Sequence, residues 1–298
     1  MQRFKNILVA LNDIVGDDDT LSQAAALAKR NDAHLTVVDI IEGMRSADGF
    51  IAEKEKHLHR ITAAFQQDGI KIKTVVLTGT PFLEIIRQVI RNNYDLVMMT
   101  AEGGGGYMEL FFGGTSLHLM RKCPCPVWVT KPGINHGYAR IMAAVALDTD
   151  TESELNIEIM DLATSLAELN KSDLHVAHAW DVTGNDLDTL KSEFTDEMKD
   201  WILRKHESEH QKRLDSLVRR YDLSNLNCEA HLMRGTPEYL LPQLAETSEI
   251  DLIVMGTIGR TGIPGFFIGN SAELILRQVR CAVLAVKPEG FVTPVTLQ

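Results

Sequence analysis

The sequence predicts two tandem copies of one doubly wound α/β domain, each with a five-stranded parallel sheet flanked by helices. Three observations predict this fold: a length of 298 residues, an internal repeat, and short apolar segments that alternate with helical ones. At about 100–200 residues per domain, this length corresponds to two domains. An alternating order of strands and helices is typical of a parallel sheet covered by helices on both faces.

The repeat is a gap-free match that extends over more than fifty residues. Gly79-Thr80-Pro81 recurs as Gly235-Thr236-Pro237, an offset of 235 − 79 = 156 residues. The same offset relates further identical pairs: Asp95 and Asp251, Gly103 and Gly259, Gly113 and Gly269, Cys125 and Cys281, and Lys131 and Lys287. Near the start of each copy the offset is 148 − 12 = 136, so the second copy contains 156 − 136 = 20 additional residues. Most of them fall in a charged helical stretch over residues 186–220.

The repeat also sets the expected domain bounds. We predict domain one over residues 1–133, domain two over residues 139–290, and a C-terminal tail over residues 291–298. The turn formers at positions 133–137 form the predicted linker.

The strands are expected where short apolar, β-branched runs occur, since strands buried between helix layers are apolar on both faces. In the first copy we predict strands at Ile7–Leu11, Leu35–Ile41, Lys71–Leu77, Asp95–Thr100 and Val127–Thr130. In the second copy we predict them at Met142–Leu147, Leu174–Trp180, Cys228–Met233, Asp251–Gly256 and Ala282–Val286. In both Gly-Thr-Pro triplets, Thr is the expected N-cap and Pro the first helical residue.

The composition argues against partners that need a basic surface. Apolar residues make up 45% of the chain, charged residues 24%, and the formal net charge is -11. This charge argues against nucleic acids and anionic membranes as partners. No segment approaches the ~18 apolar residues of a membrane span, and the four cysteines include no C-x-x-C pair. We therefore expect a cytoplasmic protein with reduced thiols.

A glycine-rich loop after the fourth strand of the second copy indicates a phosphate site. Two residues separate Gly256 from Gly259, nine separate Gly259 from Gly269, and Asn270-Ser271 then opens a helix. Glycines let the backbone approach a ligand closely, and a helix N-terminus favours an anion. Ligands of doubly wound sheets bind beyond the carboxyl ends of the strands, where this loop is expected. Arg260 is a candidate cation for the phosphates.

This G-x2-G-x9-G pattern followed by a small polar residue, together with the repeat, resembles the ATP-binding class of universal stress proteins, in its tandem form. The resemblance implies Rossmann-like, adenine nucleotide alpha hydrolase-like domains and a role in stress resistance. It implies ATP or another adenine nucleotide as ligand, with Mg²⁺ as a further option. The binding residues it implies in domain two, together with neighbouring candidates, are Asp148 facing the adenine, Ala179 at the base, Gly256 at the ribose, and Gly259, Arg260, Gly269, Asn270, Ser271 and Ala272 around the phosphates. Asn270 departs from the family, which has Ser or Thr there.

The first copy matches this pattern less well. Asn12 stands at the acidic position and Thr100 at the first glycine. A second, weaker site is predicted from Asn12, Gly103, Gly113, Gly114 and Thr115. Glu102 would repel phosphate there if its side chain pointed inward.

Several alternatives stay open at this point. Asn270-x-x-Glu273 is also a helix capping arrangement that needs no ligand, and Asp148 could be an ordinary cap or turn residue. His206-Glu207-Ser-Glu-His210 matches the zinc-protease signature H-E-x-x-H, but basic residues on both sides indicate a solvated helix. His118, His178, Cys123 and Cys125 are expected to be packing residues.

Three functions follow from these alternatives. The first is a regulatory protein that binds a nucleotide in domain two and is not an enzyme. The second is a slow ATPase or phosphotransfer enzyme, which lacks an obvious water-activating group. The third is a binder of a nucleotide-linked apolar metabolite, with Phe111, Phe112, Phe266 and Phe267 as candidate lining residues. The resemblance implies a pseudo-dimer within one chain, through strand pairing near Val127–Thr130 and Val283–Val286, and leaves a further homodimer open.

Overall fold

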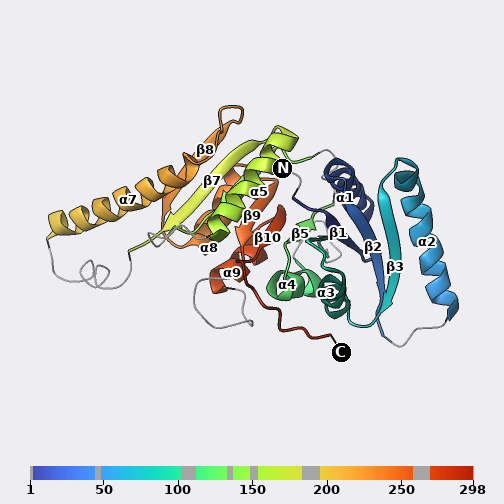
Figure 1. Cartoon of the computed structure of the whole chain (residues 1–298). Coiled ribbons are helices and arrows are strands. Elements are labelled where there is room, and N and C mark those ends of the chain that lie inside the picture. Colours follow the sequence, from blue (N-terminus) through green and yellow to red (C-terminus); the bar gives the residue numbers. More distant parts are fainter. Residues whose placement is uncertain are drawn as a thin grey trace. The chain divides into compact units, whose positions relative to one another are not determined.

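The structure is a computed structural model that describes residues 3–43, 48–102, 112–132, 137–147, 154–182, 195–257 and 269–297. The chain divides into two compact units, which we treat separately (Figure 1). The first unit comprises residues 1–138 and 256–298, and the second comprises residues 139–255. This division follows compactness rather than the repeat, so the domain bounds at residues 133, 139 and 290 stay predictions.

The first unit contains a six-stranded sheet in the order β3-β2-β1-β4-β5-β10. Its strands are β1 (Asn6–Leu11), β2 (His34–Ile41), β3 (Lys71–Thr78), β4 (Leu96–Thr100), β5 (Val127–Thr130) and β10 (Ala282–Val286). All neighbours are parallel except β5 and β10, which are antiparallel. The side chains of β4, β5 and β10 are all buried, whereas those of the edge strand β3 are largely half-buried. Burial on both faces explains the continuous apolar runs of the central strands.

Five helices of the first unit are described: α1 (Asp17–Asn31), α2 (Asp48–Gln67), α3 (Pro81–Asn92), α4 (Gly114–Lys122) and α9 (Asn270–Gln278). Helix α1 packs against β1 and β4, and α2 packs along β3, as Figure 1 shows. The predicted start of α3 is confirmed, because Thr80 is its N-cap and Pro81 its first residue. The Thr80 hydroxyl makes no capping hydrogen bond.

The second unit contains a parallel sheet in the order β9-β6-β7-β8. Its elements are β6 (Arg140–Ala144), α5 (Glu154–Asn170), β7 (Asp173–Trp180), α7 (Asp196–Val218), β8 (Cys228–Arg234), α8 (Pro237–Thr247) and β9 (Leu252–Gly256, whose last residue belongs to the first unit). Helix α7, which carries part of the predicted insertion, packs on β7 and β8. The mostly parallel α/β fold predicted from the sequence is therefore confirmed.

One predicted strand is displaced. The sequence predicts a strand over Met142–Leu147, but β6 ends at Ala144. The Asn156 side chain explains the early end, since its Oδ1 accepts from Ala146 N at 3.0 Å and its Nδ2 donates to Ala146 O at 2.7 Å. Both backbone groups of Ala146 are thus bonded to a side chain rather than to a neighbouring strand.

The strand pairing predicted between the ends of the two copies is present. In β5 and β10, Val127 faces Ala285, Trp128 faces Leu284 and Val129 faces Val283, in antiparallel register. All of these side chains are buried. The last strand of the second copy therefore completes the sheet of the first unit.

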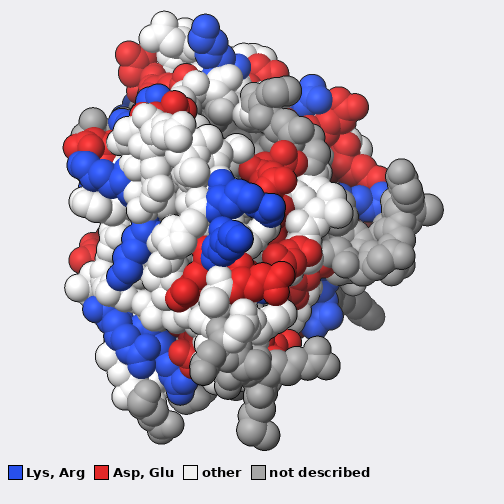
Figure 2. All heavy atoms as spheres, turned by 90° about the vertical axis from the view of Figure 1, so that its right-hand side faces the viewer, with Lys and Arg blue, Asp and Glu red and all other residues white. Residues whose placement is uncertain are grey.

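The surface shows both signs of charge. Figure 2 looks from the side on which α2 lies in Figure 1, and there Lys and Arg side chains alternate with Asp and Glu side chains. No extended basic surface of the kind that nucleic acids need is visible on this face. Among the described residues, no helix combines the length and apolar character needed to cross a membrane.

Candidate functional site

The glycine-rich loop of the second copy leads into helix α9 of the first unit. Gly269 is the N-cap of α9 and Asn270 is its first helical residue. Because the N-cap is a glycine, it has no side chain to accept a hydrogen bond from the first amides of the helix. The Gly269 amide donates to the Thr257 carbonyl at 2.9 Å, which ties the start of α9 to the end of β9. The first turn of α9 therefore presents backbone amides without a side-chain acceptor from the N-cap, an arrangement that favours an anion.

The capping interpretation of Asn270 and Glu273 is wrong. Because the N-cap is Gly269, Glu273 is the fourth helical residue, one position too far to complete a capping box. Its carboxylate instead pairs with Arg277 at 2.8 Å and with Arg121 of α4 at 2.5 Å. These interactions lower the pKa of Glu273, and the hydrogen bond from Arg277 has the largest effect.

The structure describes only part of the predicted nucleotide site. Asp148, Gly259, Arg260 and Gly103 lie outside the described residues, as do the aromatic candidates Phe111, Phe266 and Phe267. Ala179 lies on β7 next to Met233 of β8 and is half-buried. Gly256 ends β9, and Ser271 and Ala272 lie in the first turn of α9, where Ala272 is buried.

The equivalent helix of the first copy is α4, and a carboxylate lies at its first turn. Gly113 is the N-cap, and Gly114 and Thr115 open the helix. The Thr115 amide donates to Glu102 Oε2 at 3.4 Å. A Cβ built on Gly113 would lie 1.8 Å from the same oxygen, so only glycine leaves room for this side chain. Glu102 thus points toward the first turn of α4, the direction in which its charge was expected to repel a phosphate.

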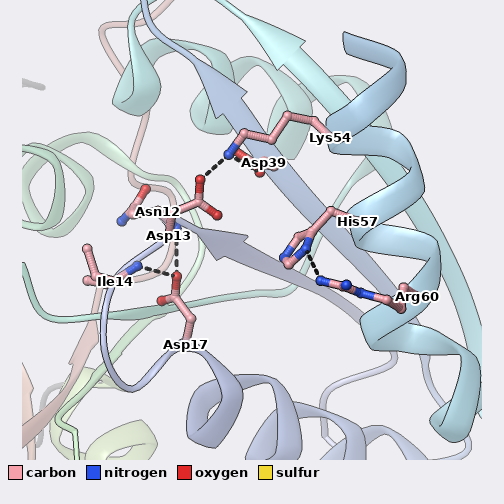
Figure 3. A network of polar contacts seen from close by, with 8 residues as sticks. All are labelled: Asn12, Asp13, Ile14, Asp17, Asp39, Lys54, His57 and Arg60. Carbon is pink, nitrogen blue, oxygen red and sulfur yellow. Dashed lines mark hydrogen bonds and ion pairs between the residues drawn. The ribbon is translucent and has the colours of Figure 1, made fainter. Parts of the chain in front are cut away.

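A polar network lies at the carboxyl end of β1 (Figure 3), on the same edge of the sheet as the carboxyl end of the parallel strand β4. The amides of Asn12 and Ile14 donate to Asp17 Oδ2 at 2.9 and 3.1 Å. Thr100 Oγ1 donates to Asp17 Oδ1 at 2.7 Å. Burial raises the pKa of Asp17, and these hydrogen bonds oppose that rise. The Asn12 backbone and the Thr100 hydroxyl, at the two positions that depart from the pattern, both bond to Asp17.

Lys54 of α2 lies next to this network and forms ion pairs with two aspartates. Its ammonium forms ion pairs with Asp13, just after β1, and with Asp39 Oδ2 of β2, the latter at 2.9 Å. Figure 3 shows the three side chains converging over the ends of β1 and β2. Burial lowers the pKa of Lys54, but its hydrogen bonds to the two carboxylates outweigh burial and raise the pKa. Sequence reasoning missed this cluster, although an aspartate within the apolar run Leu35–Ile41 was a signal for it.

His210 of the H-E-x-x-H match lies in the core, next to His178. His210, the second histidine of the H-E-x-x-H match, is buried, so the interpretation of this helix as solvated is wrong at that position. Its Nδ1 lies 2.9 Å from His178 Nε2, and His178 Nδ1 lies 3.2 Å from the Val145 carbonyl. His178 is therefore a core residue with polar partners, as expected. Among the described residues, the H-E-x-x-H match contributes to no group of three metal ligands.

The cysteines form no disulfide, and one cavity lies apart from the predicted site residues. All four cysteines are free, and the buried pair Cys123 and Cys125 has its sulfurs 3.6 Å apart. A cavity of about 410 Å³ in the first unit is lined by the first residues of three strands, among them Asn6, His34 and Lys71. It lies at the amino ends of the strands, opposite the edge at which doubly wound sheets bind their ligands.

Comparison with known proteins gives one consistent result. Residues 3–131 and residues 137–287 each match the Universal stress protein family. The chain is 30% identical over 315 aligned residues to Universal stress protein E of Escherichia coli K12, covering 100% of this chain and 98% of the relative. The corresponding protein of Photorhabdus laumondii is 26% identical over 314 residues, covering 99% and 98% of the two chains.

Solved structures have the same fold. A putative universal stress protein from Pseudomonas aeruginosa UCBPP-PA14 superimposes with a TM-score of 0.73 at 22% identity, covering 97% of this chain and 95% of that one. A universal stress protein from Archaeoglobus fulgidus gives 0.64 at 19% identity, covering 95% and 98%. The two family matches and the full-length relatives show that the chain belongs to the universal stress protein family, with two family domains in tandem.

Proposed function

We propose that the chain is a cytoplasmic regulatory protein of the stress response that binds ATP or a related adenine nucleotide in its second copy. The observation that supports this most is the difference between α9 and α4. Helix α9 begins at a glycine N-cap with no capping side chain, whereas Glu102 lies at the first turn of α4. The one acidic residue in the first turn of α9, Glu273, is paired with Arg121 and Arg277. A helix start whose amides are not bonded to a carboxylate is the better site for a phosphate group.

The proposed contacts follow the family pattern. In this proposal Asp148 and Ala179 contact the adenine, Gly256 contacts the ribose, and the segment from Gly259 to Ser271 surrounds the phosphates. Arg260 supplies a positive charge, and Mg²⁺ could accompany the phosphates. Asn270 replaces the usual hydroxyl residue, and its side-chain amide can still donate to a phosphate oxygen.

The first copy has a structural role in this proposal. Its phosphate region holds the Glu102 carboxylate, and the region beyond β1 and β2 holds the Lys54 ion pairs. The chain's own side chains fill both of these regions, so a nucleotide would have to displace them. The first copy instead supplies strand β5, on which β10 pairs.

A direct experiment is to purify the full chain, denature it, and identify the small molecules released by mass spectrometry. We expect an adenine nucleotide at up to one equivalent per chain, absent from a Gly259→Val variant. If none co-purifies, added ATP should raise the melting temperature of the wild-type chain and not that of the variant. If no nucleotide is released and added ATP does not shift the melting temperature, the proposal is overturned. Steady ATP hydrolysis that Gly269→Val abolishes would replace it with an enzymatic function.

A further inference from the structure

Two histidines and a glutamate meet on one face of the second unit, on strands β7 and β8. Strands β7 and β8 are parallel, with His175 opposite Glu229 and Ala177 opposite His231. Because side chains alternate along a strand, Glu229 and His231 lie on the same face of β8. Strand β8 is the last strand in the order of this sheet, at its edge (Figure 1).

The three side chains are close enough to share one ion. His175 Nδ1 lies 2.9 Å from His231 Nε2. Glu229 Oε2 lies 4.0 Å from His175 Nδ1, and Glu229 Oε1 lies 3.9 Å from His231 Nδ1. One ligand atom from each residue can be chosen so that all three lie within 4.8 Å of one another. Tetrahedral zinc with Zn–N bonds of about 2.0–2.1 Å separates two nitrogens by about 3.3 Å, so the histidine pair would have to open by only about 0.4 Å.

The setting also fits a metal site. The rings of His175 and His231 are stacked, with centroids 5.2 Å apart, so the two nitrogens are held together before any ion arrives. His175 is buried, and burial, followed by the charge of His231, lowers its pKa, which keeps its imidazole neutral at neutral pH. The Glu229 side chain is 69% exposed and free to swing toward an ion. Neutral imidazoles with one carboxylate are ligands that suit Zn²⁺.

We propose that His175, His231 and Glu229 form a three-ligand site for a divalent transition-metal ion, with Zn²⁺ as the reference ion, on the β7–β8 face of the second unit. Three protein ligands leave a fourth tetrahedral position for water or for a group from another molecule. Binding breaks the hydrogen bond between the two imidazoles, and the proton of that bond moves through solvent to the other nitrogen of its own ring, so that both ligating nitrogens present a lone pair. The site is separate from the proposed nucleotide residues and does not depend on them.

The test uses the untagged full chain, stripped of metal with a chelator and titrated with Zn²⁺ by calorimetry. We expect one ion per chain, and a more than about tenfold loss of affinity in Glu229→Gln and in His231→Gln, since even outer-shell changes cost about 10–100-fold. Titration with Co²⁺ should give visible absorption bands that these variants lose. Glu229 is largely exposed, so its variant should fold normally, and its melting temperature without metal checks this.

A matched control is the double variant His206→Gln and Glu207→Gln, which removes the H-E-x-x-H match on α7. It should bind Zn²⁺ as the wild-type chain does. If the wild type shows no saturable binding at one ion per chain, or if Glu229→Gln and His231→Gln bind like wild type, the histidines serve only to satisfy each other and the proposal fails. Loss of binding in the control variant would move the site to α7 and would overturn the proposal as well.

Discussion

Helices α4 and α9 occupy equivalent places in the two copies and differ most at their first turns. Both follow a glycine N-cap, Gly113 and Gly269, and neither is capped by a side chain of its N-cap residue. At α4 the Glu102 carboxylate accepts a hydrogen bond from the Thr115 amide. The repeat offset of 156 residues maps Glu102 onto Ile258, which carries no charge. The first turn of α4 thus bonds a carboxylate from the preceding loop, and the second copy has no carboxylate at the equivalent loop position.

A buried lysine of the second copy lies at the C-terminal end of α4, and the first copy has a buried lysine at the equivalent sequence position. Lys287 follows β10, and its ammonium donates to the carbonyl of Met120 in α4 and to the Thr257 hydroxyl. Lys131 follows β5 and is buried as well. A cation near the C-terminus of a helix is stabilised by the helix dipole. The shared feature is therefore structural, and the difference at the first turns is the one that bears on ligand binding.

The largest expected effect concerns Lys287 and the pH dependence of stability. Burial lowers its pKa to about 7 from 10.5. Above pH 7 the folded chain gives up this proton while the unfolded chain keeps it, so the free energy of unfolding should rise between pH 7 and about pH 10. The rise has an upper limit of about 4–5 kcal/mol, or about 1.4 kcal/mol per pH unit. Urea unfolding of the wild-type chain and of Lys287→Met at several pH values measures it.

In Lys287→Met this part of the slope should disappear. Lys131→Met is the matched control, because burial lowers the pKa of Lys131 only to about 8. Lys131→Met should remove a smaller part of the rise in the free energy of unfolding, and that part should begin about one pH unit higher. Equal slopes in the wild-type chain and Lys287→Met would mean that this ammonium stays protonated in the folded state.

The second prediction transfers the first-copy carboxylate to the second copy. Ile258→Glu should weaken ATP binding by roughly a hundredfold, or about 2–3 kcal/mol, because like charges brought together cost several kcal/mol. Calorimetric titration with ATP measures the change. Ile258→Gln, which has nearly the same shape without the charge, should keep most of the affinity. An equal loss in both variants would assign the effect to shape and would remove the charge argument.

The third prediction is the reverse exchange. In the Ile258→Glu background, Glu102→Ile should restore one ATP site per chain in the first copy, with an affinity gain of about tenfold over the background. The gain is smaller because Lys54 still pairs with Asp13 and Asp39 near the carboxyl ends of β1 and β2. Unchanged binding would show that these ion pairs, rather than Glu102, close the first copy.

Much of the fold followed from the sequence, because the repeat and the buried apolar strands are local patterns. The pairing of β5 with β10 was expected from the family resemblance and is present. The early end of β6 was not foreseeable, since the Asn156 side chain that bonds Ala146 comes from the following helix. The N-cap of α9 was misplaced by one residue because Asn270 is itself a good capping residue.

The candidate site was less predictable than the fold. The direction of Glu102 depends on the space left by Gly113, eleven residues later in the chain. The Lys54 cluster joins three separate elements, and His175 meets Glu229 and His231 only through the register of β7 and β8. Such contacts arise from tertiary structure, and the local sequence pattern marks at most one member, such as Asp39 in its apolar run, without its partners.

The smallest expected effect concerns the ion pairs between the two compared helices. Glu273 of α9 pairs with Arg121 of α4, and the equivalent of Glu273 in α4 is Leu117, so the pair has no counterpart. Both side chains are about one quarter exposed, and Glu273→Gln should cost about 0.5–1 kcal/mol at pH 7 and low salt. Since the folded pKa of Glu273 is lowered, this contribution is present above the unfolded pKa near 4.3 and lost as pH falls through the folded value. Urea unfolding at pH 7 and pH 3, with Glu246→Gln on the exposed surface of α8 as control, measures it, and a cost that persists at pH 3 would contradict the ionic explanation.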